Sequence, residues 1–321
     1  MTRNNGTYRA AAAQYKTEGT VGKIINGKAM TPMHVLDLNL NNYDKIANKA
    51  AKEDDAQIII FPEFGLFGRS RLGSTPVGSR DLILPFAQSI PKVNTRILEC
   101  YDEHVGDDGD ITLNVVVRLA RIASAYKIVV VANVAEVVRE SFGVENDIVR
   151  IYNTEVAISE DGILLGKYYK MNPFFKKTFD KPPPSQRPVI FKTYFGVDFG
   201  MFVCKDIFHA EPQKQLLAAG IRHFPYSVAM PNNWLSRWIF KLWAAKNNAV
   251  LLVSNLGCGQ SGIFGCSDKK PDFQFRVMTK DEEGNATGWC EPQTKWCELP
   301  FARDCACYTA EEGFVVATVT K

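Results

Sequence analysis

Residues 195–209 read Phe195-Gly-Val-Asp-Phe-Gly-Met-Phe-Val-Cys204-Lys-Asp-Ile-Phe-His209. The apolar part of this stretch predicts a buried strand, and the cysteine follows where the strand ends. A cysteine on a strand-to-helix turn lies beside free backbone N–H groups, which can lower the pKa of a thiol and hold an oxyanion. A lone cysteine is more often buried and inert. The stretch therefore predicts either a nucleophile or a core residue.

Two other segments also place a reactive side chain at the end of an apolar strand. The first is Ile60-Phe61-Pro62-Glu63, whose carboxyl group suits a general acid or base. The second is Gly166-Lys-Tyr-Tyr-Lys170-Met-Asn172, which closes a strand with two lysines. An exposed turn glutamate and a solvated edge lysine are the ordinary interpretations of such residues. Each segment is weak evidence when taken alone.

The rest of the chain alternates between strand and helix signals. Apolar residues at three- and four-residue steps predict one face of a helix: Leu36, Leu40, Tyr43, Ala47 and Ala50. We predict further helices at 111–126, 210–219 and 234–247, and strands at 11–15, 57–61, 128–134, 151–158, 163–169, 189–191, 200–203, from 224, and at 250–254. Residues 64–110 are typical of loops with at most short helices. This alternation predicts an α/β fold in which helices cover a mixed sheet.

Composition excludes several classes of function. The chain has 321 residues, 46% of them hydrophobic, and a net charge of +3. A nearly balanced charge without a long basic run does not favour nucleic acid or an anionic membrane as a partner. No apolar stretch reaches the roughly 18 residues of a spanning helix. The alanines at 10–13 are too few for the core of a signal peptide, which indicates either a cytosolic protein or a missing leader.

The cysteines favour the second of these options. Of eight cysteines, six are crowded near the C-terminus: Cys258, Cys266, Cys290, Cys297, Cys305 and Cys307. Such a cluster predicts about three disulfides and a secreted protein, without indicating which residues pair. Sequons at Asn5 and Asn285 are compatible with a secreted glycoprotein. Zinc is the alternative, but the cluster has no Cys-x-x-Cys pair, and no histidine follows His223.

Taken in order, these segments resemble the carbon–nitrogen hydrolase (nitrilase) family, and within it the biotinidase and vanin (pantetheinase) branch. The resemblance covers the chain from Tyr8 to Phe264 and the strand near Val315. Besides the three segments above, it rests on Tyr152-Asn-Thr-Glu-Val156, Phe224-Pro-Tyr, Trp243-Ala-Ala, Val253-Ser-Asn255 and Ser261-Gly-Ile-Phe264. Agreement of so many segments in one order is a strong signal.

The resemblance implies a fold, a chemistry and a domain organisation. The implied fold is a four-layer α-β-β-α sandwich, with a catalytic domain at 1–265 and a cysteine-rich extension at 266–321 that ends in the closing strand. The implied triad is Glu63 as general base and acid, Lys170 as oxyanion donor and Cys204 as nucleophile. The backbone N–H of Lys205 would be the second oxyanion donor. The lysine is identified as Lys170, not Lys167, by its family position. The reaction requires no metal or organic cofactor.

Three features depart from the family pattern. Family members often carry a further glutamate in the loop after the lysine, but residues 173–186 contain none. The chain also stops where a second, mostly β domain would begin in the vanin branch. The family partner of Cys100 falls at Leu119, so we expect Cys100 to be unpaired. We expect a homo-oligomer, or a partner chain in place of the absent domain, as the ways to complete such a molecule.

The substrate pocket is less well indicated. We expect Trp234 and Asn172 to line it, although core packing is the ordinary interpretation of Trp234, Trp238 and Trp243 on one helix. The implied substrate is a small linear amide, such as a pantetheine-like or biotinyl amide. The alternatives are another amidase of the family (an omega-amidase or a nitrilase) and a catalytically silent secreted scaffold. A Cys/His protease that uses His209 is a weaker alternative, because no Asn or Asp partner is evident.

Overall fold

A computed structural model describes residues 6–25, 27–68, 78–100, 114–141, 147–230, 234–257, 261–265, 273–290, 296–297, 304–305, 307–308 and 312–321. The side chains at 140, 141, 147, 234, 273, 290, 296, 297, 304, 305, 307 and 308 lie outside this description. The six C-terminal cysteine side chains are therefore not described, and neither is that of Trp234. Their predicted disulfides and zinc alternative lie outside the described residues.

A single curved mixed sheet organises the chain. Its strands run in the order β7-β6-β5-β4-β1-β11-β10-β9-β8. Their bounds are β7 (Leu164–Tyr169), β6 (Asp147–Ile158), β5 (Val129–Ser141), β4 (Ile58–Ile60), β1 (Thr7–Tyr15), β11 (Val250–Leu256), β10 (His223–Val228), β9 (Asp198–Gly200) and β8 (Ile190–Lys192). The central strands are parallel: β1 pairs with both β4 and β11, and β10 pairs with β11. The pairs β5–β6 and β6–β7 at one edge and the pair β8–β9 at the other edge are antiparallel.

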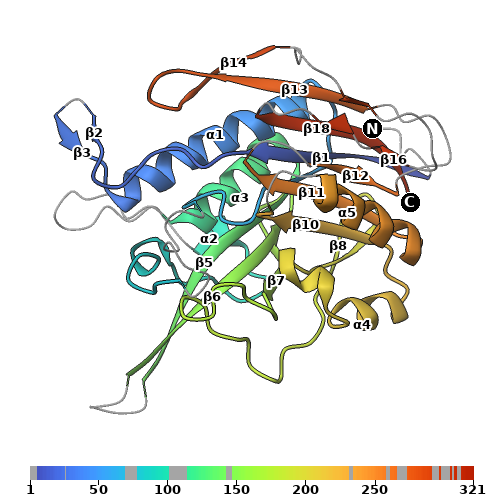
Figure 1. Cartoon of the computed structure of the whole chain (residues 1–321), viewed down its shortest axis with the longest axis horizontal. Helices are drawn as coiled ribbons and strands as arrows, with labels where there is room; N and C mark the ends of the chain where they lie inside the picture. Colours follow the sequence, from blue (N-terminus) through green and yellow to red (C-terminus); the bar gives the residue numbers. More distant parts are fainter. Residues whose placement is uncertain are drawn as a thin grey trace.

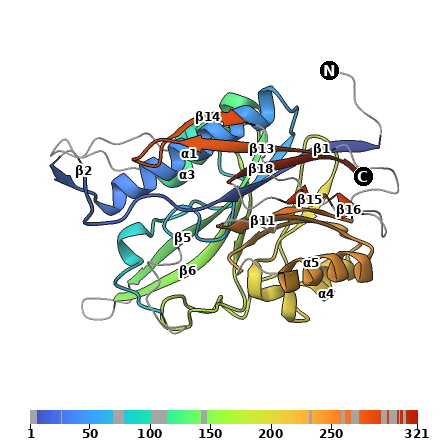
Figure 2. The same cartoon turned by 45° about the horizontal axis from the view of Figure 1, so that its top comes forward.

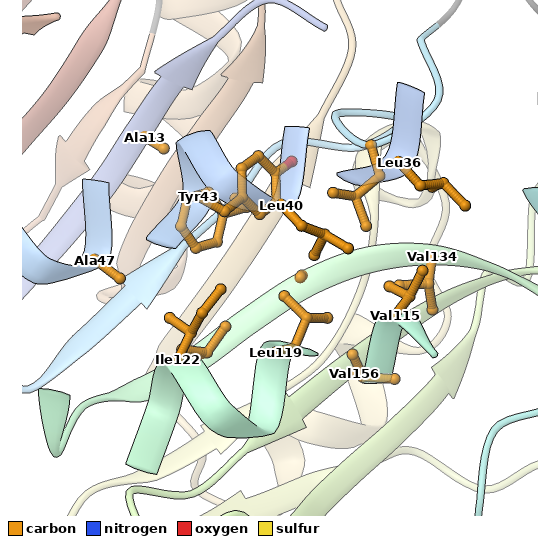
Figure 3. Close-up of a cluster of buried hydrophobic side chains, with 14 of the residues drawn as sticks. Ala13, Leu36, Leu40, Tyr43, Ala47, Val115, Leu119, Ile122, Val134 and Val156 are labelled. Atoms are coloured by element: carbon orange, nitrogen blue, oxygen red, sulfur yellow. The ribbon is translucent and has the colours of Figure 1, made fainter. Parts of the chain in front are cut away.

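Helices α1 (Pro32–Lys52) and α3 (Val115–Tyr126) cover one face of the sheet. Thr31 begins α1 with a capping box, and Asn114 caps α3. Every residue of the predicted apolar face of α1 is buried in the core beneath it. Figure 3 shows Leu36, Leu40 and Tyr43 of α1 facing Leu119 and Ile122 of α3 in this cluster. The amphipathic pattern therefore explains how this layer packs.

Helices α4 (Gln213–Ala218) and α5 (Trp234–Asn247) cover the opposite side, as the turned view in Figure 2 also shows. The sheet separates the two cores by side-chain alternation. Ile58 and Ile60 belong to the core that contains Phe240 of α5, whereas Ile59 belongs to the core beneath α1. Strands buried on both faces read as continuous apolar runs. The core around Ile58 and Ile60 also contains Val129 of β5 and Phe224 of β10, so the two halves of the curved sheet pack on one another between the helix layers. The molecule is therefore an α-β-β-α sandwich, as predicted.

The C-terminal strands extend the sheet beside β1. Strand β18 (Gly313–Thr320) pairs antiparallel with β1 along Thr7–Gln14, and β13 (Phe273–Lys280) pairs with β18 and with β14 (Ala286–Cys290). The remaining short elements are β2 (Ile24–Ile25), β3 (Lys28–Ala29), η2 (Leu84–Phe86), α2 (Ile97–Cys100), η3 (Cys204–Phe208), β12 (Gly262–Phe264), β15 (Trp296–Cys297), β16 (Asp304–Cys305) and β17 (Cys307–Tyr308). The domain boundary at 265 stays a prediction.

Some element boundaries differ from the sequence prediction. The strand predicted at 200–203 is wrong, because β9 ends at Gly200 and residues 201–203 form a buried connection to η3. The helix predicted at 210–219 begins only at Gln213, because Pro212 interrupts the preceding turn. The helix predicted from 111 is described only from Val115 onwards. None of these shifts moves Cys204 away from the end of the apolar run.

Candidate active site

Glu63 lies three residues beyond β4 and is 1% exposed. Its Oε1 atom accepts a hydrogen bond of 2.7 Å from Asn153 Nδ2 and a second hydrogen bond from Lys170 Nζ. The other oxygen, Oε2, has no hydrogen-bond partner among the residues that the structure describes. Glu63 thus has one oxygen fixed by two donors and one oxygen that is unpartnered within the described residues.

Two asparagines from neighbouring strands hold this geometry. Asn133 of β5 accepts from the backbone N–H of Phe64 at 3.1 Å and donates to the side-chain oxygen of Asn153 at 2.6 Å. Asn153 of β6 donates to Glu63, and its carbonyl oxygen accepts from the backbone N–H of Lys170 at 2.9 Å. Phe64 has a left-handed backbone with φ of 62°, which a bulky residue adopts only at a cost. The hydrogen bonds of Asn133 and Asn153 therefore stabilise a strained turn that presents Glu63.

Lys170 follows β7 directly, is 2% exposed and forms a buried ion pair with Glu63. Burial alone would lower the pKa of Lys170, but the charge that Cys204 gains when it ionises, together with the charges of Glu63 and Asp206, outweighs it and raises the pKa. The ammonium therefore stays charged. Lys167 lies elsewhere, since its Nζ atom pairs with Glu136 at 2.9 Å. The structure thus brings Lys170, not Lys167, to Glu63.

Cys204 is the first residue of η3, has a left-handed backbone with φ of 46° and is 9% exposed. The hydroxyl of Tyr226 donates to its carbonyl oxygen at 2.7 Å. Burial and then the charge of Glu63 raise the pKa of the thiol to about 12, although Lys170 and the backbone N–H of Ala229 act in the opposite direction. The resting thiol is therefore protonated, and it requires a base to become a nucleophile.

Asp206 connects the cysteine turn to the lysine strand. Its Oδ2 atom accepts from the hydroxyl of Tyr168 at 2.8 Å and from the backbone N–H of Val203 at 3.1 Å. Its Oδ1 atom accepts from both the backbone and the side-chain nitrogen of Asn172 at 2.9 Å. Burial raises the pKa of Asp206, whereas Lys170 and these donors lower it. Asp206 therefore fixes the turn that carries Cys204 against the end of β7.

The other residues named in the sequence analysis occupy different environments in the structure. The side chain of Asn172 is directed to Asp206. The backbone N–H of Lys205 has no hydrogen-bond partner within the described ranges, and its role as an oxyanion donor stays a prediction. His209 is exposed and ends η3. Cys100 is a free, exposed thiol, as expected.

The three tryptophans of α5 do not share one environment. Trp243 packs on the rings of Phe202 and Phe224, which agrees with core packing. Core packing is wrong for Trp238, which is 49% exposed and contacts Lys241. The side chain of Trp234 lies outside the described residues, so its pocket role stays a prediction.

Sequence analysis missed four polar residues that support the site: Asn133, Asn153, Glu155 and Asp206. All four are at most 3% exposed. A signal was present, because Asn153-Thr-Glu155 interrupts the apolar strand Ile151–Ile158. A buried polar group is costly unless it is hydrogen-bonded, so such an interruption indicates a polar network.

Neither a metal-ion site nor a membrane-spanning helix is found in the described part of the chain. Within it, no group of three or more His, Cys, Asp or Glu side chains could hold a metal ion. Nor does any helix found there combine the length and apolar character needed to cross a bilayer.

The chain combines an α-β-β-α sandwich with a buried acid, a buried lysine and a buried cysteine. The model of the carbon-nitrogen hydrolase family matches residues 9–263. The chain belongs to this family.

Relatives and solved structures agree with this assignment. The chain is 27% identical over 289 residues to a biotinidase from Rattus norvegicus, covering 86% of this chain and 52% of that protein. It is 28% identical over 269 residues to a pantetheine hydrolase from Homo sapiens, covering 77% and 48%. The chain thus spans about half the length of these curated relatives. An amidase from Nesterenkonia sp. has a similar fold, with a TM-score of 0.56 and 17% identity over 99% of this chain and 92% of that one.

Proposed function

We propose that this chain hydrolyses a small linear amide through a thioester on Cys204. The observation that carries the proposal is the approach of three buried groups from distant parts of the chain. Glu63 and Lys170 form an ion pair, and both charges act on the Cys204 thiol. Burial makes these charges interact more strongly than they would in water. An inert core cysteine would not require this surrounding set of charges.

The mechanism begins with proton transfer. Glu63 removes the proton of the Cys204 thiol, and the sulfur forms a bond to the amide carbonyl carbon. The Lys170 ammonium and the Lys205 N–H stabilise the oxyanion of the tetrahedral intermediate. As the C–N bond breaks, Glu63 returns the proton to the departing amine. Glu63 then deprotonates a water molecule, whose oxygen attacks the thioester carbon. The C–S bond breaks, and Glu63 returns the proton to the sulfur, which releases the carboxylic acid and restores the thiol.

The substrate class follows from the relatives. Their names are biotinidase and pantetheine hydrolase, so biotinyl and pantetheine-like amides are our first candidates. The test is a release assay on a panel of a biotinyl amide, pantetheine and simple primary amides, with the Cys204→Ala variant as the blank. Release that depends on Cys204 supports the proposal. Equal release by wild type and variant on every amide contradicts it.

Glu63→Gln should affect hydrolysis and thiol reactivity in opposite directions. Loss of the base lowers kcat by on the order of 10² to 10⁴-fold. The charge of Glu63 raises the pKa of the Cys204 thiol, so its removal lowers that pKa, and the resting thiol should react with iodoacetamide at a lower pH. Rates of labelling across a pH series measure this shift. Glu136→Gln, which removes a buried glutamate beside Lys167, is the control. A Glu63→Gln variant with unchanged hydrolysis, or with labelling moved to higher pH, contradicts the assignment.

Secretion with disulfides is a further part of the proposal. The predicted disulfide cysteines lie at 258, 266, 290, 297, 305 and 307, whereas Cys100 and Cys204 are free. Mass spectrometry of the denatured protein, alkylated with and without prior reduction, counts the free thiols and the thiols held in disulfides. We expect reduction to expose these six thiols in addition to the two free ones. Full alkylation without reduction would contradict it. A partner chain or a second copy that completes the molecule remains part of the same proposal.

A further inference from the structure

Glu155 is a buried carboxyl group that the mechanism above does not use. It lies on β6, is 1% exposed, and its Oε1 atom contacts the hydroxyl of Ser227 on β10. Its Oε2 atom has no hydrogen-bond partner in the described part of the chain. An ionised carboxylate would leave a charged oxygen buried without a donor, which is costly.

The hydrogen count around Ser227 indicates which atom carries the proton. Ser227 Oγ also lies 2.6 Å from the carbonyl oxygen of Phe61. A hydroxyl has one hydrogen, and a carbonyl oxygen can only accept. Ser227 therefore donates to Phe61, and its contact with Glu155 is a hydrogen bond only if Glu155 is the donor. This arrangement requires a protonated Glu155.

The charges that face Glu155 favour the same state. Glu63 and Lys170 lie close enough to act on it, and the hydroxyls of Tyr43 on α1 and Tyr168 on β7 also face it. Burial, and to a smaller extent the charge of Glu63, raise the pKa of Glu155 to about 8, against the effects of Ser227, Asn133 and Lys170. Lys170 is already paired with Glu63, so it does not compensate a second carboxylate fully.

We propose that Glu155 is a protonated positioning residue that fixes the general base through Ser227 and the carbonyl group of Phe61. This inference rests on the proposed function. Phe61 precedes Pro62 and Glu63, and its own N–H donates to Val131 at 2.9 Å. The acid on β6 thereby attaches the segment that carries Glu63 to β10, in the opposite half of the sheet. Ionisation of Glu155 would break this attachment and place a second negative charge beside Glu63.

The proposal predicts how stability and activity depend on pH. A folded-state pKa raised from 4.5 to about 8 means that folding retains a proton which the unfolded chain releases. The resulting stabilisation is complete below 4.5 and is lost as the pH rises through 8. Wild type should therefore lose thermal stability relative to Glu155→Gln over this window. An alkaline fall in kcat near pH 8 should likewise be present in wild type and absent in Glu155→Gln.

Three variants test the proton itself. Glutamine is neutral and can donate to Ser227, so Glu155→Gln should keep kcat near wild type at neutral pH. Glu155→Leu has no donor, and Ser227→Ala removes the bridging hydroxyl, so both should lose on the order of tenfold in kcat or more. Infrared spectra of the substrate-free protein at neutral pH should contain the carbonyl stretch of a protonated carboxyl group, which Glu155→Gln removes.

The outcomes separate this inference from the proposed function. An active wild type in which Glu155→Gln changes no carboxyl band, or loses as much activity as Glu155→Leu, overturns the inference and leaves the function intact. If wild type cleaves no amide in the panel but Glu155→Gln removes the carboxyl band, the protonation of Glu155 is supported and the proposed function is contradicted. The infrared measurement does not depend on turnover, so it tests the proton even in that case.

Discussion

Replacing Cys204 with alanine should abolish amide hydrolysis, with a loss in kcat on the order of 10⁴ to 10⁶-fold. Sulfur forms the covalent intermediate in the proposed mechanism, and neither Glu63 nor Lys170 can substitute for it. The side chain is 9% exposed and small, so the variant should fold and keep its unfolding temperature close to that of wild type. Measured kcat on the best amide of the panel, together with the unfolding temperature, tests the prediction.

Cys100 provides a matched control, because among the described cysteine side chains it is the other free thiol but is exposed. Cys100→Ala should keep full activity, and iodoacetamide should still inactivate it. Peptide mapping after labelling should locate the inactivating group on Cys204. If Cys204→Ala hydrolyses amides as fast as Cys100→Ala, the thiol is not the nucleophile.

Lys170→Met should produce the second large effect, on both catalysis and stability. Losing one oxyanion donor typically costs on the order of 10² to 10³-fold in kcat. The change also leaves Glu63 buried at 1% exposure without its cation, and breaking a buried ion pair costs about 3 to 5 kcal/mol of unfolding free energy. Denaturant unfolding and steady-state kinetics measure the two losses separately.

Lys167→Met is the control for this prediction, because both lysines flank the same tyrosine pair and each contacts one buried glutamate. Lys167 pairs with Glu136 and is 18% exposed on its side chain. Its removal should lower stability but leave kcat near wild type. Equal losses of kcat in the two variants would mean that Lys170 has no special catalytic role.

The double variant Glu63→Gln/Lys170→Met separates stability from catalysis further. Replacing Glu63 with a neutral side chain removes the unpaired charge, so the double variant should be more stable than Lys170→Met alone. It should nevertheless be inactive. Recovery of activity along with stability would show that the pair supports only the fold.

Much of the fold could be predicted because its signals are local. The helix face Leu36 to Ala50 packs as its periodicity predicts, and the apolar run Gln57 to Phe61 contains the buried strand β4. The end of the second run indicated Glu63, and the end of the apolar run 199–203 indicated Cys204. The strand predicted at 200–203 failed because burial and strand pairing are separate properties, and Met201 to Val203 are buried without belonging to a strand.

The partners of the supporting residues could not be predicted from local patterns. Glu155 and Ser227 are 72 residues apart, and neither residue type indicates a partner on a distant strand. The same holds for Asp206 in η3, whose bond to Tyr168 of β7 joins residues 38 positions apart. A polar residue within an apolar strand signals a network, but only the folded sheet shows which groups complete it. The choice between Lys167 and Lys170 also needed the family resemblance, because both close the same strand.

A structure of the protein reacted with fluoroacetamide tests the central claim most directly. The amidase from Nesterenkonia sp. has been solved as a variant with the acetamide moiety of fluoroacetamide added to its active-site cysteine, which makes the reagent a suitable probe. We predict a bond from Cys204 Sγ to the methylene carbon of the acetamide group, formed as fluoride leaves, with the amide oxygen bound by Lys170 Nζ and the Lys205 N–H, and with Glu63 beside the sulfur. An acetamide group attached elsewhere, or an amide oxygen that contacts neither donor, would contradict the account.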